Sequence, residues 1–323
     1  QVAICQPRFN NAELEAEKGN VRSELTGYLN NHSRVLWPKI QQLLGEDILT
    51  YWQRIQTINN VTLKDIKEHY SRTHTAHNMR FVIAGKLHGR RKEIIRMLED
   101  WELEKGERFE VPKDELSSGN PTIIRRKEAS NITFGLSLMV PRELTDDELE
   151  AMNCLDHILT GTMHSRIYGA ARAKGLAYGI FSDTTAGFYD SSWDFGGQVN
   201  HDTAGRLFDI IVREVQAVVD GGLEENELEA AKSYALGRYQ MGAQTVSQIS
   251  GFYTNRYFAD GIVKEYEKVP EAIRAVTCKQ MVDTAKLFLD ANTWVLAAVT
   301  SEEKDEIVGL SEKLEILFPS SVK

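Results

Sequence analysis

Few residues in this sequence have types and spacings that could do chemistry. Residues 13–18 read Glu-Leu-Glu-Ala-Glu-Lys and their carboxylates could ligate a metal, although an acidic helix is usually a solvated surface. His74 and His77 are three residues apart in a turn, and this spacing does not place both on one helical face as a metal site would require. His157 and His164 are seven apart, with no residue between them that could act as a catalytic base. Two other catalytic classes are excluded because the sequence has no Gly-x-Ser-x-Gly elbow and no phosphate-binding glycine loop.

The acidic segment is repeated later in the chain. Residues 227–232 read Glu-Leu-Glu-Ala-Ala-Lys, five of six identical at an offset of 227 − 13 = 214. Residues 61–64 return as 276–279, and residues 78–84 return as 292–298, in nearly the same register. This pattern indicates a duplicated domain. In the second copy, residues 122–226 precede the repeated half. In the first copy, only twelve residues precede it, so we expect roughly a hundred residues of the first copy to be missing at its front.

Composition excludes several classes of partner. The chain has 323 residues, 42% of them hydrophobic, and a formal charge of −9 with scattered basic residues, which argues against nucleic acid and anionic membranes as partners. Cys5, Cys154 and Cys278 are odd in number and far apart, as in a reducing compartment. No signal peptide or long apolar run is visible, so we predict a cytoplasmic location, although the targeting region of the first copy is not visible.

The first copy reads mostly as helices. Periodicity predicts helices at 11–30 and 34–60, the second with a break at Pro38, and Thr62 to Asp65 forms a capping box that opens a helix through about Tyr70. Residues 79–84 read as a compact apolar strand. Residues 89–103 read as a helix whose inward residues are Ile94, Ile95, Met97 and Leu98.

The second copy reads as a complete α+β layer. Strands are predicted at 132–140, 177–184, 188–199 and 293–299, and helices after Thr145, at 165–173, 203–220, 224–243, 245–259 and 278–289, and after Thr300. Strands followed by helices, with one late strand returning to the sheet, indicate an α+β fold of two homologous lobes, each a mostly antiparallel sheet covered on one face by helices. Residues 104–121 have no apolar period. We therefore predict the end of a first lobe at 1–105, a linker at 106–121 and a complete second lobe at 122–323.

Two segments suggest a family. Residues 14–21 read Leu-Glu-Ala-Glu-Lys-Gly-Asn-Val, and residues 165–178 read Ser-Arg-Ile-Tyr-Gly-Ala-Ala-Arg-Ala-Lys-Gly-Leu-Ala-Tyr. The first resembles the Glu-x-Glu-(Arg/Lys)-Gly-x-Val helix of insulinase/pitrilysin-type zinc peptidases, the inverzincins. The second resembles their Ser-Arg-Leu-Phe…Arg-Glu-Lys…Gly-Leu-Ala-Tyr stretch. The resemblance covers the chain in order and matches the short two-lobed branch that includes the mitochondrial processing peptidases.

The resemblance implies a zinc site that this chain holds only in part. In the family, His-x-x-Glu-His supplies two zinc ligands and the general base, roughly seventy to eighty residues before the glutamate that completes the site, which places it before Gln1. Glu15 is then the third ligand, with Glu17 as the alternative, and Glu229 is a relic of the duplication. No catalytic residue is expected within this chain, so the chain alone should be inactive and should not hold zinc by itself.

The resemblance also implies substrate-binding residues in the second lobe. The matching arginine and tyrosine, Arg172 and Tyr178, would reach across the cavity between the lobes to hold and polarise a peptide. Their spacing is 178 − 172 = 6, whereas the family usually has seven. The alternative is that Arg172 is a surface charge at the end of a helix and Tyr178 a half-buried strand aromatic.

The resulting functional prediction has two forms. The first is a zinc-dependent metalloendopeptidase that acts on peptides or unfolded chains enclosed between two lobes, with this chain as a portion that lacks the main zinc motif. The second is a non-catalytic insulinase-like subunit that binds peptides or scaffolds a catalytic partner. Expected partners are a peptide substrate and a second polypeptide, which could be an identical chain, a paired insulinase-like subunit or the chain's own N-terminal segment.

Overall fold

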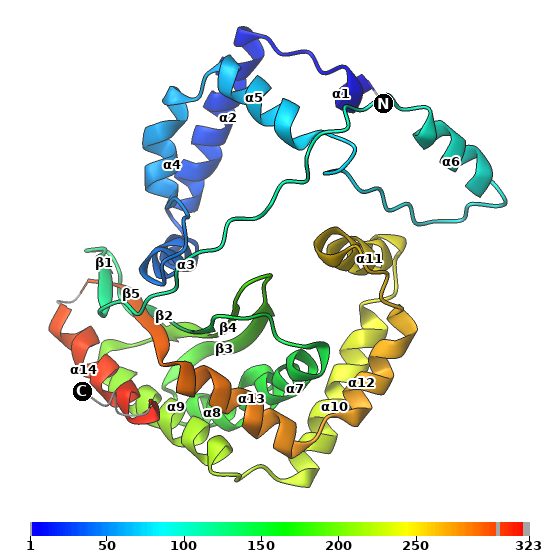
Figure 1. Cartoon of the computed structure of the whole chain (residues 1–323). Helices are drawn as coiled ribbons and strands as arrows, with labels where there is room; N and C mark the ends of the chain where they lie inside the picture. The colour runs from blue at the N-terminus through cyan, green and yellow to red at the C-terminus, as the bar shows by residue number, and fades with distance from the viewer. Residues whose placement is uncertain (1, 302–303, 319–323) are drawn as a thin grey trace. The chain divides into compact units, whose positions relative to one another are not determined.

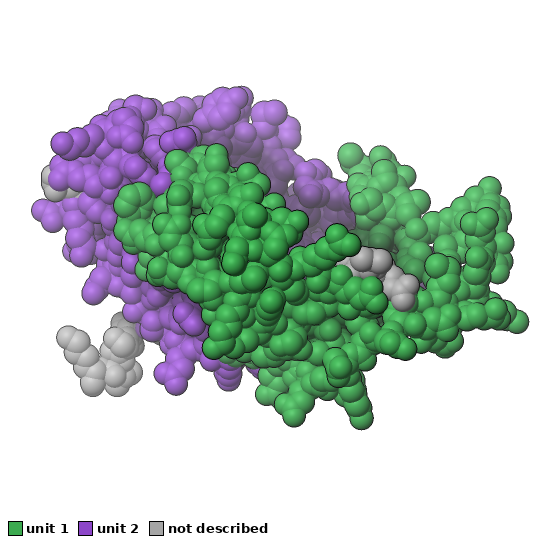
Figure 2. All heavy atoms as spheres, turned by 90° about the horizontal axis from the view of Figure 1, so that it is seen from above, with its two compact units in different colours: residues 1–28, 51–112, 240–266 green, residues 29–50, 113–239, 267–323 purple. Residues whose placement is uncertain are grey.

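The chain divides into two compact units in the computed structural model, which describes residues 2–301 and 304–318. Unit 1 consists of residues 1–28, 51–112 and 240–266, and unit 2 of residues 29–50, 113–239 and 267–323 (Figure 2). Each unit therefore contains segments of both repeats. The lobe boundaries predicted from the sequence stay a prediction.

Unit 2 is built on a five-stranded sheet with the order β1-β5-β2-β4-β3. The strands are β1 (Thr122–Arg125), β2 (Ile132–Val140), β3 (Ala177–Ala186), β4 (Ser191–Val199) and β5 (Thr293–Thr300). β1 is parallel to β5, and the other neighbouring pairs are antiparallel. The predicted α+β fold is confirmed. β1 was not predicted, because four residues are too few to show an alternating pattern.

One face of the sheet packs against helices. These are α7 (Asp146–Asp156), α8 (Arg166–Ala173), α9 (Ala204–Val219), α13 (Cys278–Ala291) and α14 (Lys304–Leu314), all drawn on the same side of the sheet in Figure 1. The Phe134 ring of β2 lies 5.0 Å from Phe208 of α9, and the Trp193 ring of β4 lies 6.0 Å from Phe288 of α13. Each such fully buried side chain contributes roughly 1.5–3 kcal/mol. This core fixes the sheet on which the site residues stand.

The opposite face carries one helix from the first repeat. α3 (His32–Leu43) packs Leu36 and Ile40 against Val295 and Val299 of β5. Gly135 of β2 makes the close approach possible, because a Cβ there would lie 2.5 Å from Cδ1 of Ile40. The sheet is therefore covered on its second face too, over β2 and β5, by a helix that the sequence pattern assigned to the other lobe.

The described part of unit 1 is helical. It contains α1 (Val2–Cys5), α2 (Asn11–Tyr28), α4 (Tyr51–Thr57), η1 (Ile58–Asn60), α5 (Leu63–Thr73), α6 (Arg91–Glu99) and α11 (Val246–Asp260). The remaining elements of the chain are η2 (His157–Gly161, a π-helical turn), η3 (His201–Thr203), α10 (Glu225–Met241), η4 (Tyr266–Lys268), α12 (Val269–Ala275) and η5 (Glu315–Leu317). In the described ranges 2–301 and 304–318, no helix is long and apolar enough to cross a membrane.

Three predictions for the first repeat were wrong. The helical pattern at 34–60 does not break at Pro38, which lies inside α3, but at Gly45, where φ is +98°. Residues 79–84 form no strand, because the described residues of unit 1 contain no other strand with which they could pair. In α6, Ile95 and Met97 are 41% and 60% exposed rather than inward.

The duplication is visible in the geometry of equivalent residues. Lys18 Nζ lies 2.8 Å from a Glu15 carboxylate oxygen, and Lys232 Nζ lies 2.9 Å from the equivalent oxygen of Glu229. Helices α5 and α13 both begin with a capping box, from Thr62 and from Thr277. Equivalent sequence therefore produces equivalent local structure in both copies.

A buried carboxyl fastens α7 to the sheet. Oδ1 of Asp156 accepts a hydrogen bond from Trp193 Nε1 at 3.0 Å, and Oδ2 accepts one from the Thr184 hydroxyl at 2.8 Å. Burial raises the pKa of Asp156 to about 7, although Ser182, Thr184 and Trp193 lower it by hydrogen bonding. Asp156 thus links α7 to both β3 and β4.

Asp156→Asn should flatten the pH dependence of stability. The folded pKa of about 7 lies above the ordinary aspartate pKa of 3.8, so between these pH values the folded state binds a proton that the unfolded state has released. The unfolding free energy of the wild type should therefore fall as pH rises through this window, by about 1.4 kcal/mol per pKa unit. Urea unfolding at several pH values measures this slope. Asp290→Asn, on the exposed surface of α13, is the control, and an equal slope in wild type and Asp156→Asn would contradict the assignment.

Amide hydrogen exchange should separate the two copies of the repeated strand sequence. Residues 80–84 have no backbone hydrogen bond among the described residues, whereas the equivalent β5 is paired on both sides. Exchange in β5 should be slower by at least ~100-fold. Mass spectrometry of peptides covering the two segments makes the comparison within one sample. Similar protection in both segments would show that residues 80–84 are paired in solution.

Candidate functional site

Arg172 and Tyr178 lie side by side at the junction of α8 and β3. Helix α8 ends at Ala173, and Gly175 turns the chain with φ +63°, a conformation that favours glycine. Leu176 is then buried, which starts β3 in a fixed direction. The Arg172 guanidinium carbon lies 5.7 Å from the centroid of the Tyr178 ring, within the range of a cation–π contact.

A β-bulge determines where Tyr178 points. Ala177 pairs with Val199 and Gly179 pairs with Gln198, so Tyr178 is the extra residue in the β3 strand. Its side chain is 86% exposed, whereas the alternative interpretation expected Tyr178 to be a half-buried aromatic residue of a strand. The six-residue spacing therefore does not separate the pair. The pair offers a cation and an aromatic ring to a ligand, and its role in substrate binding stays a prediction.

Glu15 and Glu17 lie on the exposed surface of α2 in unit 1. Glu15 pairs with Lys18, which also donates a hydrogen bond to the Asn59 carbonyl at 3.4 Å. Within the ranges 2–301 and 304–318, no group of three or more His, Cys, Asp or Glu residues could hold a metal ion. A single exposed carboxylate does not fit a zinc ion, which needs at least three protein ligands, so no chemical step can be derived through zinc from these residues.

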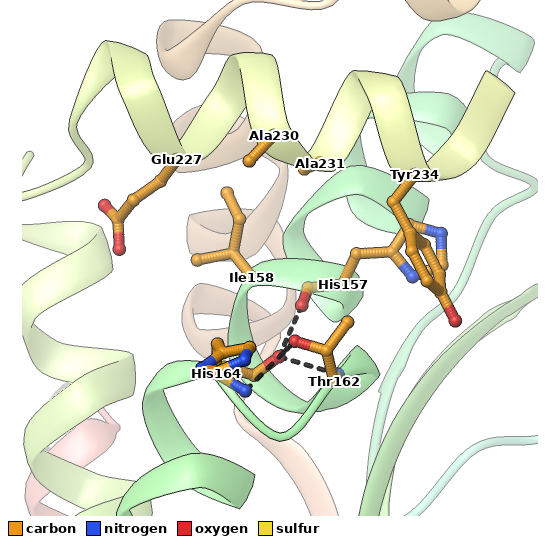
Figure 3. A pocket seen from close by; sticks show the side chains of 9 residues that line it. His157, Ile158, Thr162, His164, Glu227, Ala230, Ala231 and Tyr234 are labelled. Carbon is orange, nitrogen blue, oxygen red and sulfur yellow. Dashed lines mark hydrogen bonds between the residues drawn. The ribbon is translucent and has the colours of Figure 1, made fainter. Parts of the chain in front are cut away.

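A small pocket lies between η2, the start of α8 and α10. Figure 3 shows Ala230 and Ala231 of α10 facing Ile158, His157 and Thr162. The cavity holds about 150 Å³ and is also lined by His164, Ser165, Glu227 and Tyr234. Hydrogen bonds from the Ser165 hydroxyl to the His157 carbonyl and from the Thr162 amide to Ser165 Oγ, both 2.8 Å, fix the turn.

The His157 ring and the Glu227 carboxylate in the pocket are already engaged. Burial and the nearby Arg238 lower the pKa of His157 to about 4, so its imidazole is neutral at pH 7, and its ring packs edge-on against Tyr234 at 4.6 Å. Arg166 holds the Glu227 carboxylate with two hydrogen bonds and lowers its pKa. His164 is exposed at the edge of the pocket. This pocket can admit a small group but offers no activated nucleophile.

Sequence reasoning missed two carboxyls of unit 2, the buried Asp156 and the half-buried Asp194. Asp156 ends a helix whose other acidic residues are not buried, and Asp194 stands between Trp193 and Phe195 at the position where an alternating strand is usually polar. Only the three-dimensional packing shows that Asp156 is buried and that Oδ1 of Asp194 is shielded from solvent. The signal present in the sequence was an aspartate within a strand, a residue type depleted there.

Comparison with known proteins places the chain in a family. The family described as "Peptidase M16 inactive domain" matches residues 60–234, more than half of the chain. This chain belongs to the peptidase M16 family. The insulinase-type resemblance is thereby confirmed. Within M16, the match is to the domain described as inactive, and it includes α8, Arg172 and Tyr178.

The individual relatives and similar structures are distant in sequence. "Non-peptidase homolog YmxG" of Helicobacter pylori is 22% identical over 259 residues, 78% of this chain, and the chain spans 58% of that relative's length. The peptidase M16 inactive domain from Pseudomonas fluorescens superposes with a TM-score of 0.76 at 17% identity, covering 93% of this chain and 73% of that one. A chain of complex III2 from Candida albicans, with Inz-5 bound, gives a TM-score of 0.79 at 9% identity, covering 94% of this chain and 74% of that one. These two structures show the fold.

The chain by itself should not bind zinc stoichiometrically. Glu15 is paired with Lys18 and has no companion ligands among the described residues. Calorimetric titration of the metal-free chain with Zn²⁺ should give no equimolar binding, and Glu15→Ala should give the same titration as the wild type. One tightly bound equivalent that disappears in Glu15→Ala would contradict this prediction.

Proposed function

We propose that this chain is a non-catalytic M16 domain that binds an extended peptide and scaffolds a catalytic partner. The observation that carries the proposal is the match of residues 60–234 to the inactive M16 domain. The name of the Helicobacter pylori relative, a non-peptidase homolog, supports the same conclusion. The zinc metalloendopeptidase form of the prediction requires a His-x-x-Glu-His motif, and residues 1–323 do not contain one.

The exposed Arg172–Tyr178 pair supports peptide binding. Tyr178 is more exposed than a strand aromatic normally is, and the bulge keeps it in that position without a ligand. The arginine can donate hydrogen bonds to peptide carbonyls, and the phenol can pack against or hydrogen-bond a peptide chain. Neither group needs a metal for this task. The pair therefore suits a domain that holds a peptide but does not cleave it.

Apolar surface on unit 1 supports the scaffolding part of the proposal. Phe81 and Ile83 are 38% and 48% exposed, and Ile95 and Met97 on α6 are also exposed. Within the part of the chain that the structure describes, the backbone of residues 80–84 makes no hydrogen bond, and an added strand could pair with it. A second polypeptide would cover both the apolar side chains and the backbone groups. Glu15 would serve as a third zinc ligand only with two histidines from another polypeptide segment.

Peptide affinity should depend on the Arg172–Tyr178 pair. Tyr178→Ala and Arg172→Gln should each weaken binding of a fluorescein-labelled unstructured peptide by roughly tenfold, measured by fluorescence anisotropy on the full chain. Because both side chains are exposed, the unfolding free energy should change by less than about 1 kcal/mol. Arg274→Gln on the exposed surface of α12 is the matched charge control. Equal affinities for all variants would exclude this pair, and no binding by the wild type would exclude the peptide-holding function.

A further inference from the structure

The two repeats exchange one helix. α3 and α11 are copies of each other, because their N-cap residues are 245 − 31 = 214 positions apart, the offset of the repeat. Asn31 and Thr245 also cap in the same way, each accepting a hydrogen bond from the backbone amide three residues later. α3 comes from the first repeat and lies in unit 2, whereas α11 comes from the second and lies in unit 1. Each unit therefore contains a copy of the helix that, in unit 2, covers the second face of the sheet.

The repeated segment at residues 79–84 meets α11 as β5 meets α3. Arg80 donates a hydrogen bond to the Phe258 carbonyl, near the end of α11, at 2.6 Å. In unit 2, Val295 near the start of β5 and Leu43 at the end of α3 belong to one hydrophobic cluster. The start of the repeated segment thus lies at the same end of the exchanged helix in both units.

The strand residues that face the exchanged helix are larger in unit 1. Val295 and Ala297 of β5 pack on the α3 side of the sheet. At the offset of 214, they correspond to Phe81 and Ile83. The first repeat therefore places more side-chain volume on the segment than the second places on β5.

The helix residues change in the opposite direction. Three residues of α3 that contact the sheet are large, and their counterparts in α11 are smaller: Leu36, Trp37 and Ile40 correspond to Ser250, Gly251 and Thr254. A packed layer keeps its total volume, so large strand residues belong opposite a small helix face. This reciprocal change indicates that Phe81 and Ile83 are shaped to pack in a layer against α11.

The position of one strand in this layer is open in unit 1. In unit 2, β2 pairs antiparallel with β5, contacts α3 and is buried along its whole length. Among the residues of unit 1 that the structure describes, no strand takes the place of β2 beside residues 79–84. Phe258 is accordingly 63% exposed, whereas its counterpart Leu44 is 1% exposed. The second repeat thus shows in bound form what the first repeat leaves uncovered.

We infer that unit 1 binds one apolar β-strand of a partner polypeptide, antiparallel to residues 79–84 and packed against α11, in the register that β2 has with β5. This inference rests on the scaffolding part of the proposed function and names the chemistry of the partner. Gly135 of β2 pairs with Ala297, so the partner residue opposite Ile83 occupies the position of Gly135. Because α11 is small where α3 is large, this partner residue carries a side chain where β2 has a glycine.

The test uses the full chain and two labelled peptides with the sequence of residues 131–140, which contains β2, and lysines added at both ends for solubility. One peptide keeps Gly135 and the other has Gly135→Val. The valine peptide cannot replace β2 in unit 2, because a Cβ at this position would lie 2.5 Å from Cδ1 of Ile40. It should bind the chain at least as tightly as the glycine peptide, and should slow amide exchange of residues 79–84 by ~tenfold or more while leaving β5 unchanged.

Two variants locate the binding site. Ile83→Asp should weaken binding of the valine peptide by about tenfold, whereas Ile316→Asp, at a 70% exposed position of η5 in unit 2, should change it by less than about twofold. Ser250→Leu restores the size that α3 has at this position. It should weaken binding of the valine peptide by about tenfold and leave the glycine peptide within about twofold, a difference that non-specific adhesion to an apolar surface would not produce.

Three results would overturn the inference. They are unchanged exchange at residues 79–84 with the valine peptide, equal effects of Ile83→Asp and Ile316→Asp, and protection of residues 79–84 without any peptide in a chain that sediments as a dimer, which would identify a second copy as the occupant. All three leave binding of the unstructured peptide at Arg172 and Tyr178 in place. Loss of that binding in the wild type would instead overturn the proposed peptide-holding function, whatever the two strand peptides do.

Discussion

The architecture of unit 2 depends on the pairing of one late strand. β5 enters the sheet between β1, which it pairs in parallel, and β2, which it pairs antiparallel. Its two faces also complete two separate cores: Leu296 and Ala298 face the helices, and Val295, Ala297 and Val299 face α3. Because β5 pairs with neighbours on both edges and packs on both faces, the five-stranded sheet and both of its cores are complete only when β5 has joined them. The repeated sequence at residues 79–84 has the same apolar character, yet it stays a loop because no other strand is present in the described part of unit 1. Pairing with neighbouring strands, rather than local β-propensity, therefore decides whether this repeated sequence forms a strand.

The edge strand β3 shows how the site depends on this sheet. Away from β4, the Ser182 amide donates to the Thr160 hydroxyl at 2.7 Å, and Thr184 donates to Asp156. Side chains of α7 and η2 thus hold the middle of an edge that would otherwise be free. Its first residues have no such support, and the bulge there turns Tyr178 outward beside Arg172. The pair therefore lies next to the held part of β3, at an exposed position that suits a holding function.

The sequence predicted the features that local interactions determine. The capping boxes at Thr62 and Thr145 and the alternating strand β2 were found correctly, because each is set by residues within a few positions. The sequence could not place α3, since the cover for Leu36 and Ile40 comes from strands far along the chain. Nor could it reveal the exposure of Tyr178, which depends on one unpaired residue in the register. The Arg172–Tyr178 pair was singled out from the resemblance, and its role in substrate binding stays a prediction.

The duplication also bears on how Glu15 should be understood. In both copies a lysine that is mostly buried pairs with an exposed glutamate three residues earlier: the side chains of Lys18 and Lys232 are 10% and 12% exposed, those of Glu15 and Glu229 67% and 62%. The second copy reproduces this arrangement although no His-x-x-Glu-His precedes it in the chain. The pairing is therefore explained by the need to neutralise a lysine packed against its helix, and it requires no metal. The Arg172–Tyr178 pair lies where α8 meets β3, so its position depends on the same helix-covered sheet and not on a metal.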